Sequence, residues 1–227
     1  ITYTFPVGEN LTVLVGDSTS GSALYSTACA YGGFTNTLDD CGNGNSAFGT
    51  NSDGSVGFSA AYDIGEGFTG AIGYVGSGSV ADGLMSKEST DYWGGQLAYT
   101  ADSYGLSATY ATKETSTTEE TVYLGLNGYW TPSETGAIPS ISVGYETGKV
   151  SNETGGTAEV ANSSNRDTFQ YFLGLQWDEV GPGTLGAAIG TFGVMTETAG
   201  VLPERMMYEA YYSYPVNDGM TITPLIY

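Results

Sequence analysis

The chain has 227 residues, with 25 Asp and Glu against 5 Lys and Arg, no histidine, and a formal net charge of −20 at pH 7. Such a polyanion is unsuited to binding nucleic acid, and the lack of histidine excludes Ser-His-Asp and Cys-His catalytic sites and most zinc sites. No run of about 18 consecutive apolar residues occurs, which excludes a transmembrane helix. We therefore expect no enzymatic activity, no cofactor and no bound metal.

In chain order, apolar and polar residues alternate in twelve runs that predict an all-β protein. Strands that cross a membrane need only about 9–11 residues each, and because they alternate they leave no hydropathy peak. The predicted strands are 1–6, 11–16, 55–63, 67–76, 90–100, 104–113, 121–131, 139–149, 167–177, 183–193, 206–215 and 219–227.

The links between these runs are short and long in turn. The short links, such as "DIGEG", "DEVGPG" and "PVNDG", carry the Gly, Pro, Asn and Asp residues of tight turns. The long links are 17–54, 77–89, 114–120, 150–166 and 194–205. This alternation is typical of a transmembrane antiparallel β-barrel, which has short turns on one rim and long loops on the other. A β-sandwich has no reason to sort its links in this way.

The run "DTFQYFLGLQW" shows how the two faces of a strand differ. Every second residue from Phe169 to Trp177 is apolar, whereas Gln170 and Gln176 belong to the opposite face. The same reading of the other strands gives one apolar face, expected to meet lipid, and one face of small and polar residues, expected to line a water-filled lumen. The predicted lumen-lining residues are Gln96, Tyr123, Asn127, Tyr129, Gln170, Gln176, Glu209 and Tyr211. For Glu209 two interpretations remain open, a buried structural partner or a charge that faces the lumen.

Aromatic residues gather where the predicted strands meet the short links. In a membrane barrel these rings form a girdle at the level of the lipid headgroups. The alternative is that they close the end of a sandwich core. The girdle residues that we predict are Tyr62, Phe68, Trp130, Trp177 and Tyr214.

The two cysteines, Cys29 and Cys41, lie in the longest link, 17–54. So local a pair in a long external segment predicts a disulfide in an oxidising compartment, with two free thiols as the alternative. The spacing supports neither zinc nor thioredoxin-like chemistry. Paired carboxylates such as Asp39 and Asp40 lack the spacing of a calcium loop, so a solvated loop charge is the simpler interpretation.

Several segments together resemble the barrel of the cyanobacterial outer-membrane porins that carry an S-layer-homology domain, a family often labelled carbohydrate-selective or iron uptake porin. The segments are "YTFPVGENLTVLVG", "GFSAAYDIGEGFTGAIGYV", "LAYTADSYGLSATYAT", "YLGLNGYWTPSETGAIPSISVGYE", "LGLQWDEVGPGTLGAAIG" and "YEAYYSYPVNDGMTITPLIY". The resemblance implies a sixteen-stranded barrel, usually trimeric, in an outer membrane, with a peptidoglycan-binding domain at its N-terminus. We expect residues 1–227 to be one barrel domain, without that N-terminal domain, the first three strands or the last strand.

If the first three of sixteen strands precede residue 1, the 17–54 link is the third external loop, which in porins folds into the barrel and narrows it. The resemblance thus implies that a Cys29–Cys41 bridge clamps a constriction loop carrying Asp17, Asp39, Asp40 and Asp53. General porins oppose this loop with a ladder of arginines, yet no Lys or Arg lies in mid-strand here. We therefore expect a passive channel for ions and small hydrophilic solutes that weakly prefers cations. The alternatives are a channel specific for sugars or inorganic iron, and a secreted soluble adhesin or lectin.

Overall fold

The computed structural model describes residues 1–33, 41, 56–77, 83–86, 89–115, 119–134, 136–152, 167–191, 195–196 and 206–227. Every regular element in these ranges is a β-strand, so the all-β prediction is confirmed. Among the described residues, no helix is long and apolar enough to cross a membrane.

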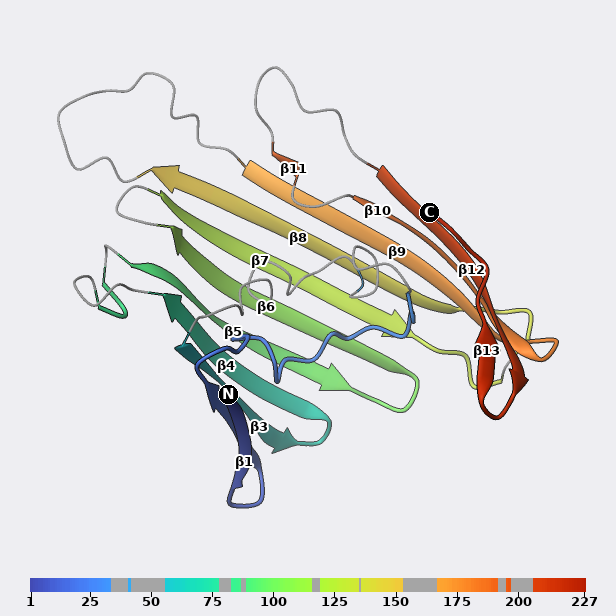
Figure 1. The fold of residues 1–227 in the computed structure, drawn as a ribbon, viewed down its shortest axis with the longest axis horizontal. Coiled ribbons are helices and arrows are strands. Elements are labelled where there is room, and N and C mark those ends of the chain that lie inside the picture. Colours follow the sequence, from blue (N-terminus) through green and yellow to red (C-terminus); the bar gives the residue numbers. More distant parts are fainter. Residues whose placement is uncertain are drawn as a thin grey trace.

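The strands form one antiparallel sheet whose order follows the chain from β1 to β10 and on to β12 and β13, with β11 paired to β9 and β14 to β12 (Figure 1). Each predicted strand has its counterpart in the sheet. The strands are β1 Thr2–Val7, β2 Leu11–Gly16, β3 Val56–Gly65, β4 Phe68–Ser77, β5 Thr90–Thr100, β6 Tyr104–Thr115, β7 Glu119–Trp130, β8 Ser140–Asn152, β9 Asp167–Val180, β10 Gly183–Thr191, β11 Met195–Thr196, β12 Met206–Asn217, β13 Met220–Ile222 and β14 Leu225–Ile226.

The sheet is open. Among the described strands no pairing joins β1 to β13 or β14, and the two edges lie apart in Figure 1. The prediction of an antiparallel sheet is therefore confirmed, whereas a closed barrel belongs to the proposal below.

The short links all lie at one end of the sheet, as the sequence predicts. Between β3 and β4 the link is only Glu66 and Gly67, with φ of 54° and 82°. Two successive positive φ values are what a tight type I′ hairpin needs, because this turn matches the twist of its strands.

At the opposite end, one prediction of a long link is wrong. Strand β6 continues to Thr115 and β7 begins at Glu119, so the expected 114–120 link is reduced to 116–118. The pairing of Lys113 with Thr121 and of Glu114 with Glu120 extends the ladder into residues that had been assigned to the loop. The predicted strand 219–227 is also interrupted, because Pro224 separates β13 from β14 and cannot donate to a ladder.

The two faces of the sheet have opposite character. One face carries large apolar side chains that no described residue covers, and we call it the outer face. Its exposed members include Val56, Ile72, Trp93, Leu97, Leu106, Tyr110, Leu124, Leu126, Ile141, Val143, Tyr145, Leu173 and Tyr208. The register places them side by side from strand to strand, as in the pairs Tyr110–Leu124 and Val143–Leu173. The other face, which we call the covered face, is lined by small and polar residues.

Candidate functional site: the covered face and the segment that crosses it

A row of polar side chains runs across the covered face. In register order across β5, β6, β8 and β9 it contains Gln96, Thr109, Glu146 and Gln170, with Gly125 of β7 between Thr109 and Glu146. Gln96 donates through Nε2 to Thr109 Oγ1 at 3.0 Å, and Gln170 donates through Nε2 to Glu146 Oε1 at 2.7 Å. All four side chains are buried. Alternation of strand residues is sufficient to produce this row, since every member has an outward-facing apolar neighbour.

After β2 the chain leaves the sheet and runs across several of its strands, as the blue trace in Figure 1 shows. We call residues 19–33 the crossing segment. Its first half binds β3 and β5. Leu24 N donates to Ser59 Oγ at 3.2 Å. Ser26 N donates to Gln96 Oε1 at 2.7 Å, and Gln96 Nε2 donates back to Ser26 O at 2.8 Å. The Gln96 side chain thus satisfies both the N–H and the C=O of Ser26, as the backbone of a neighbouring strand would do in a sheet.

The second half of the crossing segment binds β8, β9 and β12. Ala30 N donates to Ser142 Oγ at 2.9 Å, and Gly32 N donates to Gln176 Oε1 at 2.9 Å. These contacts join backbone groups to side chains of the wall. Because they are spread over strands far apart in the sheet, the segment is fixed along its length rather than at one point.

Tyr31 makes the most deeply buried of these contacts. Its hydroxyl donates to Glu209 Oε1 at 2.7 Å, and its ring lies 5.5 Å from Phe172 and 5.8 Å from Tyr211, measured between centroids. Burial, with the hydrogen bond to Glu209 and its charge, raises the pKa of the Tyr31 hydroxyl, so Tyr31 remains the donor. Glu209 therefore has a buried structural partner, Tyr31, which is the first of the two interpretations given above.

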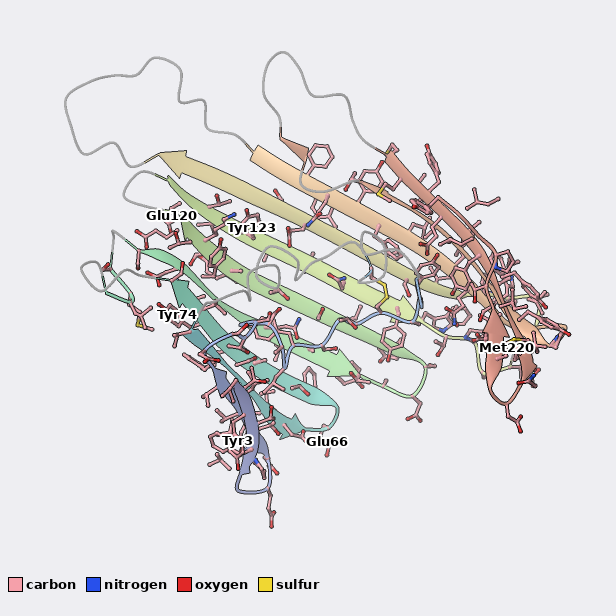
Figure 2. All side chains as sticks on the ribbon, viewed as in Figure 1. Tyr3, Glu66, Tyr74, Glu120, Tyr123 and Met220 are labelled. Atoms are coloured by element: carbon pink, nitrogen blue, oxygen red, sulfur yellow. A yellow bond between two sulfur atoms is a disulfide. The ribbon has the colours of Figure 1, made fainter. Side chains whose placement is uncertain are left out.

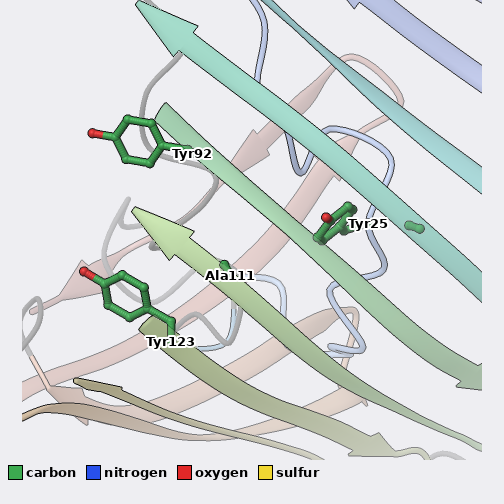
Figure 3. Close-up of a cluster of buried hydrophobic side chains, with 5 residues drawn as sticks. Tyr25, Tyr92, Ala111 and Tyr123 are labelled. Carbon is green, nitrogen blue, oxygen red and sulfur yellow. The ribbon is translucent and has the colours of Figure 1, made fainter. Parts of the chain in front are cut away.

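A second aromatic cluster lies under the first half of the segment. Tyr25 packs with Ala71, Tyr92, Ala111 and Tyr123, all on the covered face. Figure 3 shows Tyr25 on the crossing segment and the other rings on β5 and β7. Burial raises the pKa of the Tyr25 hydroxyl.

Glycines of the wall let the segment come close. A Cβ at Gly73 would lie 1.9 Å from the backbone oxygen of Gly21, and a Cβ at Gly144 would lie 2.2 Å from that of Cys41. Any other residue at Gly73 would push the crossing segment away from the sheet, and any other residue at Gly144 would push away Cys41. The predicted disulfide is confirmed, since Cys29 and Cys41 are bonded (Figure 2). Asn127 Nδ2 also donates to Cys41 O at 3.4 Å.

No protein-family model, curated protein or solved structure matches this chain.

The eight predicted lumen-lining residues all lie on the covered face, which the cross-strand register requires. Of the four predicted constriction-loop acids, Asp39, Asp40 and Asp53 lie outside the described residues. Asp17 lies just after β2, is exposed, and forms an ion pair with the amino group of Ile1. A role of these acids at a constriction stays a prediction.

The predicted girdle residues lie near the short links. Tyr62, Phe68, Trp130 and Tyr214 are exposed, whereas Trp177 is half-buried and donates through Nε1 to Ala137 O at 3.1 Å. The rings of Phe68 and Tyr99 lie 4.7 Å apart at the same end of the sheet. Their position relative to a lipid headgroup layer stays a prediction.

Two buried acids were missed by the sequence analysis. Glu146 was predictable, because its neighbours Val143 and Tyr145 on the outer face force it to the covered face. Asp91 was not, because it lies on the outer face, where Tyr74 and Ser89 donate their hydroxyls to it. Tyr74 lies on the outer face, as its alternation with Ile72 predicts, but it is only 7% exposed there.

The contact between Tyr31 and Glu209 leads to a prediction about stability. Tyr31→Phe removes one hydrogen bond to a buried carboxylate, and we expect the free energy of unfolding to fall by about 1–3 kcal/mol. Denaturant unfolding measures this change. Tyr62→Phe, at a ring that is 50% exposed on the outer face, is the matched control and should be neutral. Equal stability of both variants would show that the Tyr31 hydroxyl is not what fixes the segment.

Proposed function

We propose that this chain forms the greater part of the wall of a water-filled diffusion channel in an outer membrane. The observation that carries the proposal is the inverted character of the sheet. Large apolar side chains lie uncovered on the outer face, and Gln, Glu, Ser and Thr are buried on the covered face. A protein in water has the opposite arrangement, because burial of apolar surface drives folding.

The size of the outer face supports lipid as its surroundings. Soluble monomers rarely expose contiguous apolar patches beyond a few hundred Å², and this face has exposed leucine, isoleucine, valine or aromatic residues on every strand from β3 to β9. Strands β5 to β9 have between 11 and 14 residues each. That length suits a tilted strand across a hydrocarbon core, which needs about 9–11 residues.

In the proposed channel the two open edges of the sheet are joined by further strands, and the crossing segment narrows the interior. Solutes pass according to size and charge, without covalent chemistry. The chain carries 25 Asp and Glu against 5 Lys and Arg, and such an excess of carboxylates around a pore favours cations over anions. The porin resemblance adds trimeric assembly and anchoring to peptidoglycan through a separate domain as proposed partnerships.

Electrical recording in a planar bilayer tests the proposal. Under a KCl gradient we expect stepwise single-channel conductance. The sign of the reversal potential should show that K⁺ permeates more readily than Cl⁻. Channels without charge preference would retain the diffusion channel but remove the carboxylates from the ion path. A folded protein that gives no channels and stays dispersed without detergent would contradict the proposal and favour the soluble adhesin or lectin.

A further inference from the structure

A pocket opens on the outer face between β4, β5 and the described residues before β5. It has a volume of about 480 Å³, within the range of roughly 300–1,000 Å³ that is usual for small-molecule sites. Its walls are aromatic, with Phe58, Tyr74 and Trp93 among the lining residues, and its floor is the backbone of three glycines, Gly73, Gly94 and Gly95. The position of Gly95 explains the hollow. It pairs with Ile72 and Tyr110, both exposed on the outer face, and has no side chain of its own there.

Two carboxylates border the pocket at its end near the long links. Asp91 and Glu114 are paired in register, and both line the pocket. Asp91 is 6% exposed and is held by the hydroxyls of Tyr74 and Ser89. Met85 N also donates to Asp91 Oδ1 at 3.4 Å, with Met85 in the left-handed region at φ 59°. Residues other than glycine rarely adopt a positive φ, and this hydrogen bond helps to hold the Met85 backbone there. Met85 also lines the pocket and is 70% exposed.

We propose that this pocket binds an uncharged glycolipid, with its sugar headgroup against Asp91 and Glu114 and its acyl chain along the outer face. Hydroxyl groups donate well to carboxylates, and Asp91 already accepts from two hydroxyls. The C–H face of a pyranose ring can pack on Trp93. Two carboxylates repel a phosphate headgroup, and a single ammonium group would fill little of the pocket.

Because the surface around the pocket is apolar, we expect the ligand to be an amphiphile with an acyl chain rather than a free sugar. Below the carboxylates, Ile72, Trp93 and Leu97 are each more than half exposed on the outer face. An acyl chain lying there would lose contact with water or replace another lipid. The inference rests on the proposed function in so far as that function places the outer face in lipid.

Native mass spectrometry of the full chain, released from micelles of a zwitterionic amine oxide, tests this site. The probes are octyl glucoside, octyl phosphocholine and octyltrimethylammonium at equal concentration, which share one tail and differ in headgroup. We expect octyl glucoside to be retained preferentially. Equal retention of all three, or preference for the ammonium probe, would overturn the assignment of the headgroup.

Two variants localise the binding. A Cβ at Gly95 would lie 3.6 Å from Ala71 O and 3.9 Å from Ile72 Cγ2, which is ordinary contact, so Gly95→Leu fills the pocket without a clash at Cβ. It should abolish preferential retention of the glucoside. Glu114→Gln should weaken it about tenfold, the change expected when a hydrogen bond to a charged acceptor becomes neutral. Ala108→Leu adds the same side chain elsewhere on the outer face and should have no effect.

Retention unchanged by Gly95→Leu would overturn the site. The bilayer recordings separate this failure from that of the channel. Normal conductance in Gly95→Leu with the glucoside preference lost would support both proposals, whereas glucoside binding by a protein without conductance would keep the pocket and remove the channel.

Discussion

Leu124→Arg is expected to destabilise the protein folded in lipid bilayers, lowering its free energy of unfolding by about 2–4 kcal/mol. This is the cost of an arginine on the lipid face of a membrane strand near the midplane. Leu124 lies in the middle of β7, Glu119–Trp130, and is 48% exposed on the outer face. The same substitution on an exposed surface in water would change stability by no more than about 0.5 kcal/mol. The expected effect is therefore large only if the outer face meets lipid.

Urea titration of refolding into phospholipid vesicles, followed by tryptophan fluorescence, measures this difference. Ser133→Arg adds the same side chain at an exposed position in the link between β7 and β8, and it should leave the folding free energy unchanged. If Leu124→Arg folds as stably as Ser133→Arg, the outer face does not meet lipid, and the apolar side chains must be covered by another protein surface.

Much of the fold follows from the sequence because two local signals agree. Alternation with a period of two sets which residues share a face, and turn residues such as Glu66 and Gly67 set where each hairpin reverses. Together they fix the antiparallel order and the register without knowledge of any distant contact. The ends of strands are less well determined. Ladder pairing extends β6 and β7 through residues, such as Glu114 and Glu120, that had been assigned to the 114–120 link.

The contacts within the candidate site could be predicted only in part from the local sequence. The inward direction of Gln96 and Glu209 follows from the alternation within their own strands. Their partners do not, because Gln96 binds Ser26 across 70 residues and Glu209 binds Tyr31 across 178 residues. No periodicity in residues 19–33 predicts these contacts, because the segment has no regular structure. Most of its contacts join its backbone groups to side chains of the sheet. In the same way, the contacts of Asp91 on the outer face with Met85 and Ser89 could not be predicted from alternation within β5.

Gly144→Ala is expected to release the crossing segment from the sheet and to raise single-channel conductance. The added Cβ would lie 2.2 Å from Cys41 O, and a backbone atom so close must move. Cys41 is bonded to Cys29, so the movement is passed to the crossing segment. We also expect the free energy of unfolding to fall by about 1–3 kcal/mol, as is usual when extra atoms are forced into a packed site. Gly70→Ala is the control, because its Cβ would meet only the end of the Ile64 side chain at 3.4 Å.

A double-mutant cycle shows whether the disulfide carries this effect. With Cys29 and Cys41 both replaced by serine, the link between Cys41 and the crossing segment is lost. Gly144→Ala should then change conductance much less than it does with the disulfide intact, and the difference is the coupling between the two sites. A fall in stability without any rise in conductance would mean that the crossing segment braces the wall but does not lie in the path of the ions. A rise of equal size in both backgrounds would instead place the obstruction at Gly144 itself, independent of the disulfide.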